Sequence, residues 1–279
     1  MIKKILVLLT GFGCDVRALE AASLLGSQHA ARIECLRVHP AAMQIIAKAA
    51  FRQFGTRMGN TELLHALQKE AAKRTTEARA SVDSFMRANP DLPVSWREIE
   101  GESVHTAIAE ARYADLVVVG HGAAESEYSA EGIGSILVGC GRPLLLVPDS
   151  PLQVIGSTIA VAWKETAEAA RAVTAAMPFL AKAGRIAVIS VSENASGAGY
   201  EPAERLARDL AAQRLPAYAN TVVPGGRPVA DVVLQAAREA GADLLVMGAY
   251  SHSRFRELVF GGFTRHVLQG CDLPVLLLH

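Results

Sequence analysis

The chain has 279 residues, of which 51% are hydrophobic and 20% charged, and its formal net charge is zero. This length suits two globular domains of about 100–150 residues each. The zero net charge gives no electrostatic argument for nucleic acid or an anionic membrane as a partner, and no apolar stretch approaches the roughly 20 residues of a membrane span. We therefore expect a soluble protein that binds neither.

The first predicted element is a buried strand at Ile5–Leu9, which follows Lys3 and Lys4. Lysines before an apolar run also begin a signal peptide, but this run is shorter than the roughly 7–15 apolar residues of a secretory signal. The four cysteines have no CxxC spacing and are expected to be buried thiols in a reducing compartment. We therefore expect a cytoplasmic protein.

Helical sequence then expands the first half between Pro40 and Asn89. The stretch Thr61–Arg87 is rich in Ala, Glu, Lys and Leu, which predicts one long helix. A shorter helix is predicted before it, near Ala41–Phe51.

The two halves of the chain repeat one another. Residues 113–120 (YADLVVVG) match residues 241–248 (GADLLVMG), and residues 139–147 (GCGRPLLLV) match residues 270–278 (GCDLPVLLL). The same order and similar spacing in both halves indicate a duplication, with a boundary in the turn-rich segment Pro148–Pro151. We therefore predict two domains, residues 1–150 and residues 151–279.

The second half alternates strand-length apolar runs with helical patterns. We predict strands at Ser157–Trp163, Arg185–Val191, Ala217–Val223, Asp243–Gly248 and Pro274–Leu278, and helices at Thr166–Lys182, Pro202–Arg214, Val229–Ala240 and Gly262–Gln269. Continuous apolar strands alternating with helices predict a doubly wound parallel α/β sheet, with five strands in each domain. Ligands of such sheets bind beyond the carboxyl ends of the strands, here in the loops after the first and fourth strands.

The loop after the fourth strand of the second half has a glycine pattern suited to phosphate. Gly248 ends the strand, Ser251 follows, and Gly261 and Gly262 precede the last helix. Glycines let the backbone approach a pyrophosphate, and the amides that begin a helix point at the anion. With the strand pattern and the duplication, this loop resembles the universal stress protein family, in a tandem arrangement of two UspA-type domains.

The resemblance implies two Rossmann-like domains of the adenine-nucleotide α-hydrolase-like type. It also implies that the second domain binds ATP or a related adenine nucleotide, with Mg²⁺ as a companion ion, as a regulatory ligand of a non-enzymatic stress-response protein. The residues that would contact the nucleotide are Ala162, Trp163, Lys164, Val191, Met247, Gly248, Ala249, Ser251, Gly261, Gly262, Phe263 and Thr264.

Three positions of the second half depart from the family pattern. Ser251 replaces a glycine, at a cost of roughly 1–2 kcal/mol where a left-handed backbone is required. Gly262 replaces a hydroxyl residue and so lacks a hydrogen bond of about 0.5–1.5 kcal/mol, which Ser251 or Thr264 would partly replace. Lys164, and Thr10 in the first half, replace an acidic residue, and a lysine cannot accept a hydrogen bond from adenine or ribose, although it reaches phosphate.

The corresponding loop of the first half is less suited to a triphosphate. It contains the glutamates Glu125, Glu127 and Glu131, whereas the second loop has His252, Arg254 and Arg256. Negative side chains repel the phosphates, so we expect nucleotide in the second half only.

Two alternatives to nucleotide-dependent regulation stay open. The second candidate is a nucleotide-free interaction module, and the third is a weak ATPase. The sequence predicts neither a catalytic residue nor a metal site. By resemblance, the last strands of the halves, Leu144–Val147 and Val275–Leu278, pair to give an intramolecular pseudo-dimer. The expanded segment Ala41–Arg87 would cap the first site or support a homodimer.

Overall fold

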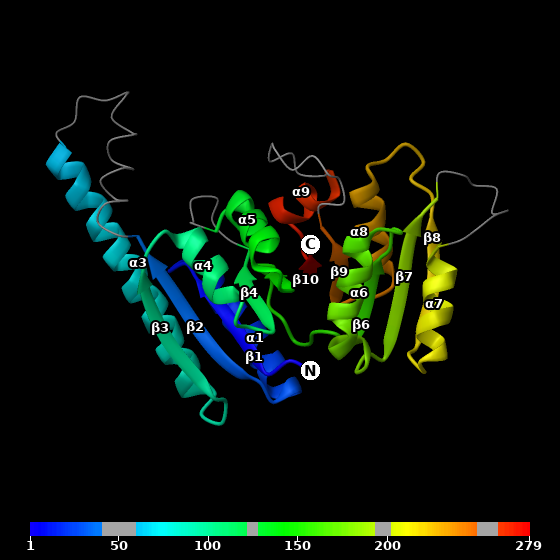
Figure 1. Cartoon of the computed structure of the whole chain (residues 1–279), viewed down its shortest axis with the longest axis horizontal. Coiled ribbons are helices and arrows are strands. Elements are labelled where there is room, and N and C mark those ends of the chain that lie inside the picture. The colour runs from blue at the N-terminus through cyan, green and yellow to red at the C-terminus, as the bar shows by residue number, and fades with distance from the viewer. Residues whose placement is uncertain (41–59, 122–127, 193–201, 250–261) are drawn as a thin grey trace. The chain divides into compact units, whose positions relative to one another are not determined.

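The computed structural model describes residues 1–40, 60–121, 128–192, 202–249 and 262–279 (Figure 1). Two compact units make up the chain: an amino-terminal unit, Ile2–Cys140, and a carboxy-terminal unit, Gly141–His279 together with Met1. The helix predicted at Ala41–Phe51 lies outside the described residues.

The amino-terminal unit has a four-stranded parallel sheet in the order β3-β2-β1-β4. Helices α1 and α3 contact one another on one face of this sheet, and α4 and α5 contact one another on the other face (Figure 1). The elements are β1 (Lys4–Leu9), α1 (Cys14–His29), β2 (Arg32–His39), α3 (Asn60–Ala88), β3 (Val94–Glu100), α4 (Ser103–Ala111), β4 (Leu116–Gly120) and α5 (Ala130–Cys140).

The carboxy-terminal unit has six strands in the order β5-β10-β9-β6-β7-β8. All neighbours are parallel except β5 and β10, which are antiparallel. The elements are β5 (Leu144–Val147), β6 (Thr158–Ala162), α6 (Ala167–Leu180), β7 (Arg185–Val191), α7 (Pro202–Ala212), β8 (Ala217–Val222), α8 (Val229–Glu239), β9 (Leu244–Gly248), α9 (Gly262–Gln269) and β10 (Val275–Leu278).

The predicted fold class is confirmed. Strand orders β3-β2-β1-β4 and β8-β7-β6-β9 are the same topology twice, and both central pairs have the same register, Leu8 beside Val119 and Ala162 beside Met247. The central strands β1, β4, β6 and β9 are apolar and largely buried because helices cover both faces of each sheet. Each half of the sequence supplies five strands, as predicted, and the long helix predicted at Thr61–Arg87 is α3.

The repeated aspartates Asp115 and Asp243 hold the start of the first strand in each half. The Asp115 carboxylate accepts hydrogen bonds from the Lys3 and Lys4 amides at 2.8 and 3.0 Å. Asp243 accepts in the same way from the Ser157 and Thr158 amides, both at 3.0 Å. Satisfying these amides fixes β1 against β4 and β6 against β9, so that the carboxyl ends of each pair lie at one edge of the sheet.

The strand pair β5 and β10 lies inside the carboxy-terminal unit. Leu146 pairs with Val275 and Leu144 with Leu277, so the compact units divide between Cys140 and Gly141, ahead of the repeat boundary predicted at residue 150. Three cysteines are buried as predicted, whereas Cys271 is only partly buried. Within the described ranges, no helix is long and apolar enough to cross a membrane.

Candidate functional site

The predicted site residues on β6 and β9 come together at one edge of the carboxy-terminal sheet. These strands are parallel neighbours with Ala162 beside Met247, so the segments 162–164 and 247–249 leave the sheet side by side. The amide of Trp163 donates to Ile189 of β7 at 2.7 Å, which extends the pairing one residue past β6. Val191 ends β7, the neighbouring strand. Seven of the predicted residues therefore lie at the carboxyl ends of β6, β7 and β9, a region that we call the mouth of this sheet.

The predicted residues around the glycine loop divide into described and undescribed ones. Gly262, Phe263 and Thr264 form the first turn of α9, where Gly262 is exposed and Thr264 is 4% exposed. Ser251 and Gly261 lie outside the described residues, as do His252, Arg254 and Arg256. Because Thr264 is on the packed face of α9, its hydroxyl is poorly placed to replace the one that is missing at Gly262.

A glycine is required at position 248 by the packing of α6 against β9, which the sequence did not reveal. A β-carbon built on Gly248 would lie 2.5 Å from the Glu168 carbonyl carbon and 2.9 Å from the Ala169 α-carbon, inside the first turn of α6. A β-carbon on Gly120 would likewise lie 2.9 Å from the Cys14 carbonyl carbon, at the start of α1. The repeated glycine therefore lets the first helix of each half pack against its fourth strand, whether or not a phosphate is bound.

The loop after β6 is held by the cap of α6. Thr166 is the N-cap residue: its side-chain oxygen accepts from the Ala169 amide at 3.3 Å, and its own amide donates to the Lys164 carbonyl at 2.7 Å. These bonds fix the backbone of Lys164, while its side chain is exposed. Among the described acidic groups, none forms an ion pair with the Lys164 ammonium, so its charge is available to an anion at the mouth.

Three further polar residues lie at this mouth, and sequence reasoning missed them. The His279 ring nitrogen Nδ1 is 3.2 Å from the Ala249 carbonyl oxygen, and Arg171 donates to the His279 carbonyl at 3.2 Å. Arg171 also pairs with Glu168 at 3.0 Å. A hydrogen bond from its own amide, with the Arg171 charge, holds the pKa of Glu168 below its usual value despite partial burial. His279 could have been found from the parallel sheet that the sequence predicts, because parallel pairing of β9 with β10 brings the residues after both strands to the same end.

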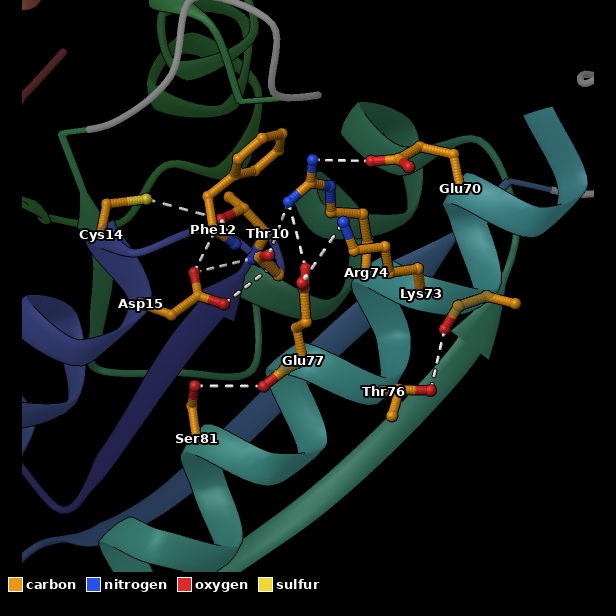
Figure 2. Close-up of polar contacts among 12 residues, drawn as sticks. Thr10, Phe12, Cys14, Asp15, Glu70, Lys73, Arg74, Thr76, Glu77 and Ser81 are labelled. Atoms are coloured by element: carbon orange, nitrogen blue, oxygen red, sulfur yellow. Dashed lines mark hydrogen bonds and ion pairs between the residues drawn. The ribbon is translucent and has the colours of Figure 1, made fainter. Parts of the chain in front are cut away.

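The loop after β1 forms the corresponding mouth of the amino-terminal unit, and it is closed by its own side chains. The Asp15 carboxylate accepts from the Thr10 amide at 2.9 Å, the Thr10 hydroxyl at 2.7 Å and the Gly11 amide at 2.7 Å (Figure 2). Asp15 is 1% exposed. Burial raises its pKa, against the opposing effect of these hydrogen bonds and of the Arg37 charge.

The registers confirm that Thr10 and Lys164 occupy corresponding positions. Each lies two residues beyond the paired position, Leu8 in β1 and Ala162 in β6. Neither residue is acidic. Across the part of the chain that the structure describes, no group of three or more His, Cys, Asp or Glu side chains could hold a metal ion.

Comparison with known proteins identifies the second half. Residues 157–279 match the model of the universal stress protein family, whereas no curated protein matches the chain. A universal stress protein from Archaeoglobus fulgidus DSM 4304 is similar over 99% of this chain and 97% of its own, with 15% identity and a TM-score of 0.73.

Two other solved structures are similar to this chain. The cytoplasmic domain of a prokaryotic cation chloride cotransporter matches over 99% of this chain and 95% of its own, with 12% identity and a TM-score of 0.51. A universal stress protein in complex with cAMP matches over 53% of this chain and 98% of its own, with 17% identity and a TM-score of 0.32. At 12% identity, the likeness to the cotransporter domain shows a shared fold alone. The assignment to the universal stress protein family rests on the sequence match of residues 157–279.

Proposed function

Because residues 157–279 form a domain of the universal stress protein family, we propose that the carboxy-terminal unit binds an adenine nucleotide, foremost ATP, as a regulatory ligand. The nucleotide lies at the carboxyl ends of β6 and β9, and its occupancy sets the conformation of the protein or its choice of partner during a stress response. The role is binding rather than catalysis.

The observation that most supports this proposal is the convergence of residues 162–164 and 247–249 at one edge of the sheet. That edge is where doubly wound sheets bind their ligands. The first turn of α9, whose amides have no partner within the helix, follows β9 in the chain and presents the exposed Gly262. Both features suit an anionic nucleotide better than a neutral ligand.

Lys164 gives the proposed site its own character. Where the family pattern has an acidic residue for the base or ribose, this chain has an exposed ammonium on a backbone fixed by Thr166. An ammonium donates hydrogen bonds and cannot accept them. We therefore assign Lys164 to the phosphates, and adenine recognition falls to apolar neighbours such as Ala162 and Val191.

Calorimetric titration of the full chain with ATP, ADP, cAMP and adenosine, with and without Mg²⁺, tests the proposal. Replacing Lys164 by Met should weaken ATP binding about 10- to 100-fold, since a charge-assisted hydrogen bond is lost, and should leave adenosine binding unchanged. Binding of ATP with no effect of Lys164→Met would refute the phosphate assignment. No binding of any of these ligands up to millimolar concentration would refute the proposed function.

A matched pair at Gly262 isolates the missing hydroxyl. Thr and Val have the same shape, and no described atom lies within 4 Å of a β-carbon built on Gly262. If Gly262 is a phosphate contact, Gly262→Thr should bind ATP about 2- to 10-fold more tightly than Gly262→Val, the value of one hydrogen bond. Equal affinities would place Gly262 outside the phosphate site.

The nucleotide-free interaction module is the second candidate, and the close packing of Gly248 against α6 favours it. Since that glycine is required for packing, its presence alone does not indicate a phosphate site. The pairing of β5 with β10 supports a role for the two last strands in joining the halves of the sequence. In this candidate function, two whole chains would associate as a homodimer, and sedimentation equilibrium would detect that homodimer.

A further inference from the structure

Helix α3 lies directly on the loop after β1 in the amino-terminal unit. Gly11 has a φ of 77°, and a β-carbon built on it would lie 2.7 Å from both the carbonyl carbon and the α-carbon of Arg74. Backbone therefore meets backbone at this point, with no room for a side chain between the loop and the helix. Figure 2 shows the Arg74 side chain reaching from α3 to the loop at Phe12 and Thr10.

Arg74 fastens the helix to the loop by two different contacts. Its guanidinium carbon is 3.8 Å from the centroid of the Phe12 ring, and its Nη1 donates to the Gly11 carbonyl at 3.2 Å. Glu70 and Glu77, one turn away on either side, pair with the same guanidinium at 2.6 and 3.1 Å. The face of an aromatic ring attracts a cation, more strongly as the cation is desolvated, and Arg74 is held in place by its two carboxylate partners.

The backbone amides of the loop beneath Arg74 already donate hydrogen bonds within the loop and to Asp15. Thr10 and Gly11 both donate to Asp15, and the Phe12 amide donates to the Thr10 hydroxyl at 3.1 Å. Successive amides after a strand are where an anion would be held at the mouth of such a sheet. Here the anion is the protein's own carboxylate, which is almost completely buried.

The carboxy-terminal unit has a different arrangement at the corresponding loop. Lys164, which corresponds to Thr10, is exposed, and the loop is capped by Thr166 rather than closed by an aspartate. The chain from β7 to β8 is also much shorter than the chain from β2 to β3, which contains α3. Among the residues that the structure describes, only the loop of the amino-terminal unit is covered in this way.

We propose that α3 is an autoinhibitory strap: Arg74 clamps the Thr10–Asp15 loop in a form whose amides are filled by Asp15, so that the amino-terminal mouth accepts no anionic ligand until α3 is displaced. The proposal does not depend on nucleotide binding by the carboxy-terminal unit. It predicts two states of one loop, of which the closed state predominates in the free protein.

Hydrogen–deuterium exchange of the full chain tests the clamp. Arg74→Ala should speed exchange of the amides of residues 10–14 by about tenfold or more, since local opening sets the exchange rate. Arg79→Ala is the matched control, because Arg79 is on the same helix and pairs with Asp83 at 2.9 Å. Unchanged exchange at Ile5–Leu9 in both variants would show that β1 remains folded. Equal exchange of the loop in Arg74→Ala and Arg79→Ala would overturn the proposal.

Photolabelling with an azido-ATP probe tests the closure. The expected result is labelled peptides from the amino-terminal unit in Arg74→Ala and not in wild type or Arg79→Ala, at a probe concentration high enough to offset the repulsion from Glu125, Glu127 and Glu131. Phe12→Leu, which removes the ring and keeps an apolar side chain, should behave like Arg74→Ala. Labelling of this unit in wild type, or no labelling in either variant despite a loosened loop, would contradict autoinhibition. Labels in the carboxy-terminal unit report separately on the proposed nucleotide site.

Discussion

Replacing Gly248 by Ala is the perturbation that best separates packing from ligand binding at the candidate site. The new β-carbon would lie 2.5 Å from the Glu168 carbonyl carbon and 2.9 Å from the Ala169 α-carbon. Both are backbone atoms of the first turn of α6, so no side chain can rotate away. Helix α6 or strand β9 has to shift to make room.

The expected cost follows from that geometry. Overpacking of a well-packed interior costs about 1–3 kcal/mol. The shift also disturbs the N-cap bond from Ala169 to Thr166, which contributes about 1 kcal/mol. We therefore expect Gly248→Ala to lower the free energy of unfolding of the carboxy-terminal unit by about 2–4 kcal/mol, in the absence of any nucleotide.

Urea unfolding followed by tryptophan fluorescence measures this loss. In a Trp96→Phe background the signal comes from Trp163, which lies in the loop before α6. Gly270→Ala is the control, because no described atom lies within 4 Å of a β-carbon at this exposed glycine, and it should unfold within about 0.5 kcal/mol of wild type. If Gly248→Ala were as stable as Gly270→Ala, the packing explanation of the repeated glycine would be refuted.

Three other expectations concern stability and reactivity. Burial alone would raise the pKa of Glu34, but hydrogen bonds from Arg97 and Lys4 outweigh it and lower that pKa; Glu34→Gln should cost about 0.5–1 kcal/mol at neutral pH. A lowered folded pKa gives stability that is present above the unfolded pKa and lost as the pH falls through the folded value. The wild-type advantage in urea unfolding should therefore begin to fall below about pH 4.3, the ordinary pKa of a glutamate, and vanish below the lowered folded pKa. Asp243→Ala leaves strand-end amides without their acceptor and should cost about 1–3 kcal/mol by the same assay, whereas no loss would refute its role at β6. Burial raises the pKa of Cys35 to about 12, so this thiol should resist iodoacetamide in the native protein, and rapid native-state alkylation would contradict its burial.

Much of the fold could be predicted because its signals are local. Continuous apolar runs such as Arg185–Val191 and the helix Gly262–Gln269 have the bounds that the sequence indicates. The repeat also placed corresponding residues correctly, since Thr10 and Lys164 have equivalent positions in the two registers. These features depend on residue type, periodicity and spacing, all of which are visible in one chain.

The contacts that give each mouth its character could not be predicted, because they join residues far apart in the sequence. Arg74 meets Phe12 only once α3 packs beside α1. In the sequence, Gly248 fits the glycine pattern of a phosphate-binding loop, and only the structure shows that the backbone of Ala169 packs against it. His279 reaches Ala249 only through the pairing of β9 and β10. In each case the residue types allow several partners, and the tertiary packing selects one.

Native mass spectrometry of the full chain with ATP counts the nucleotides that each chain binds. We expect one ATP per chain, because the carboxy-terminal mouth presents Lys164 to the phosphates while the amino-terminal mouth is filled by Asp15. The Lys164→Met variant should retain less bound ATP at the same concentration. A chain that stays free of ATP at millimolar concentration would contradict nucleotide binding by the carboxy-terminal unit.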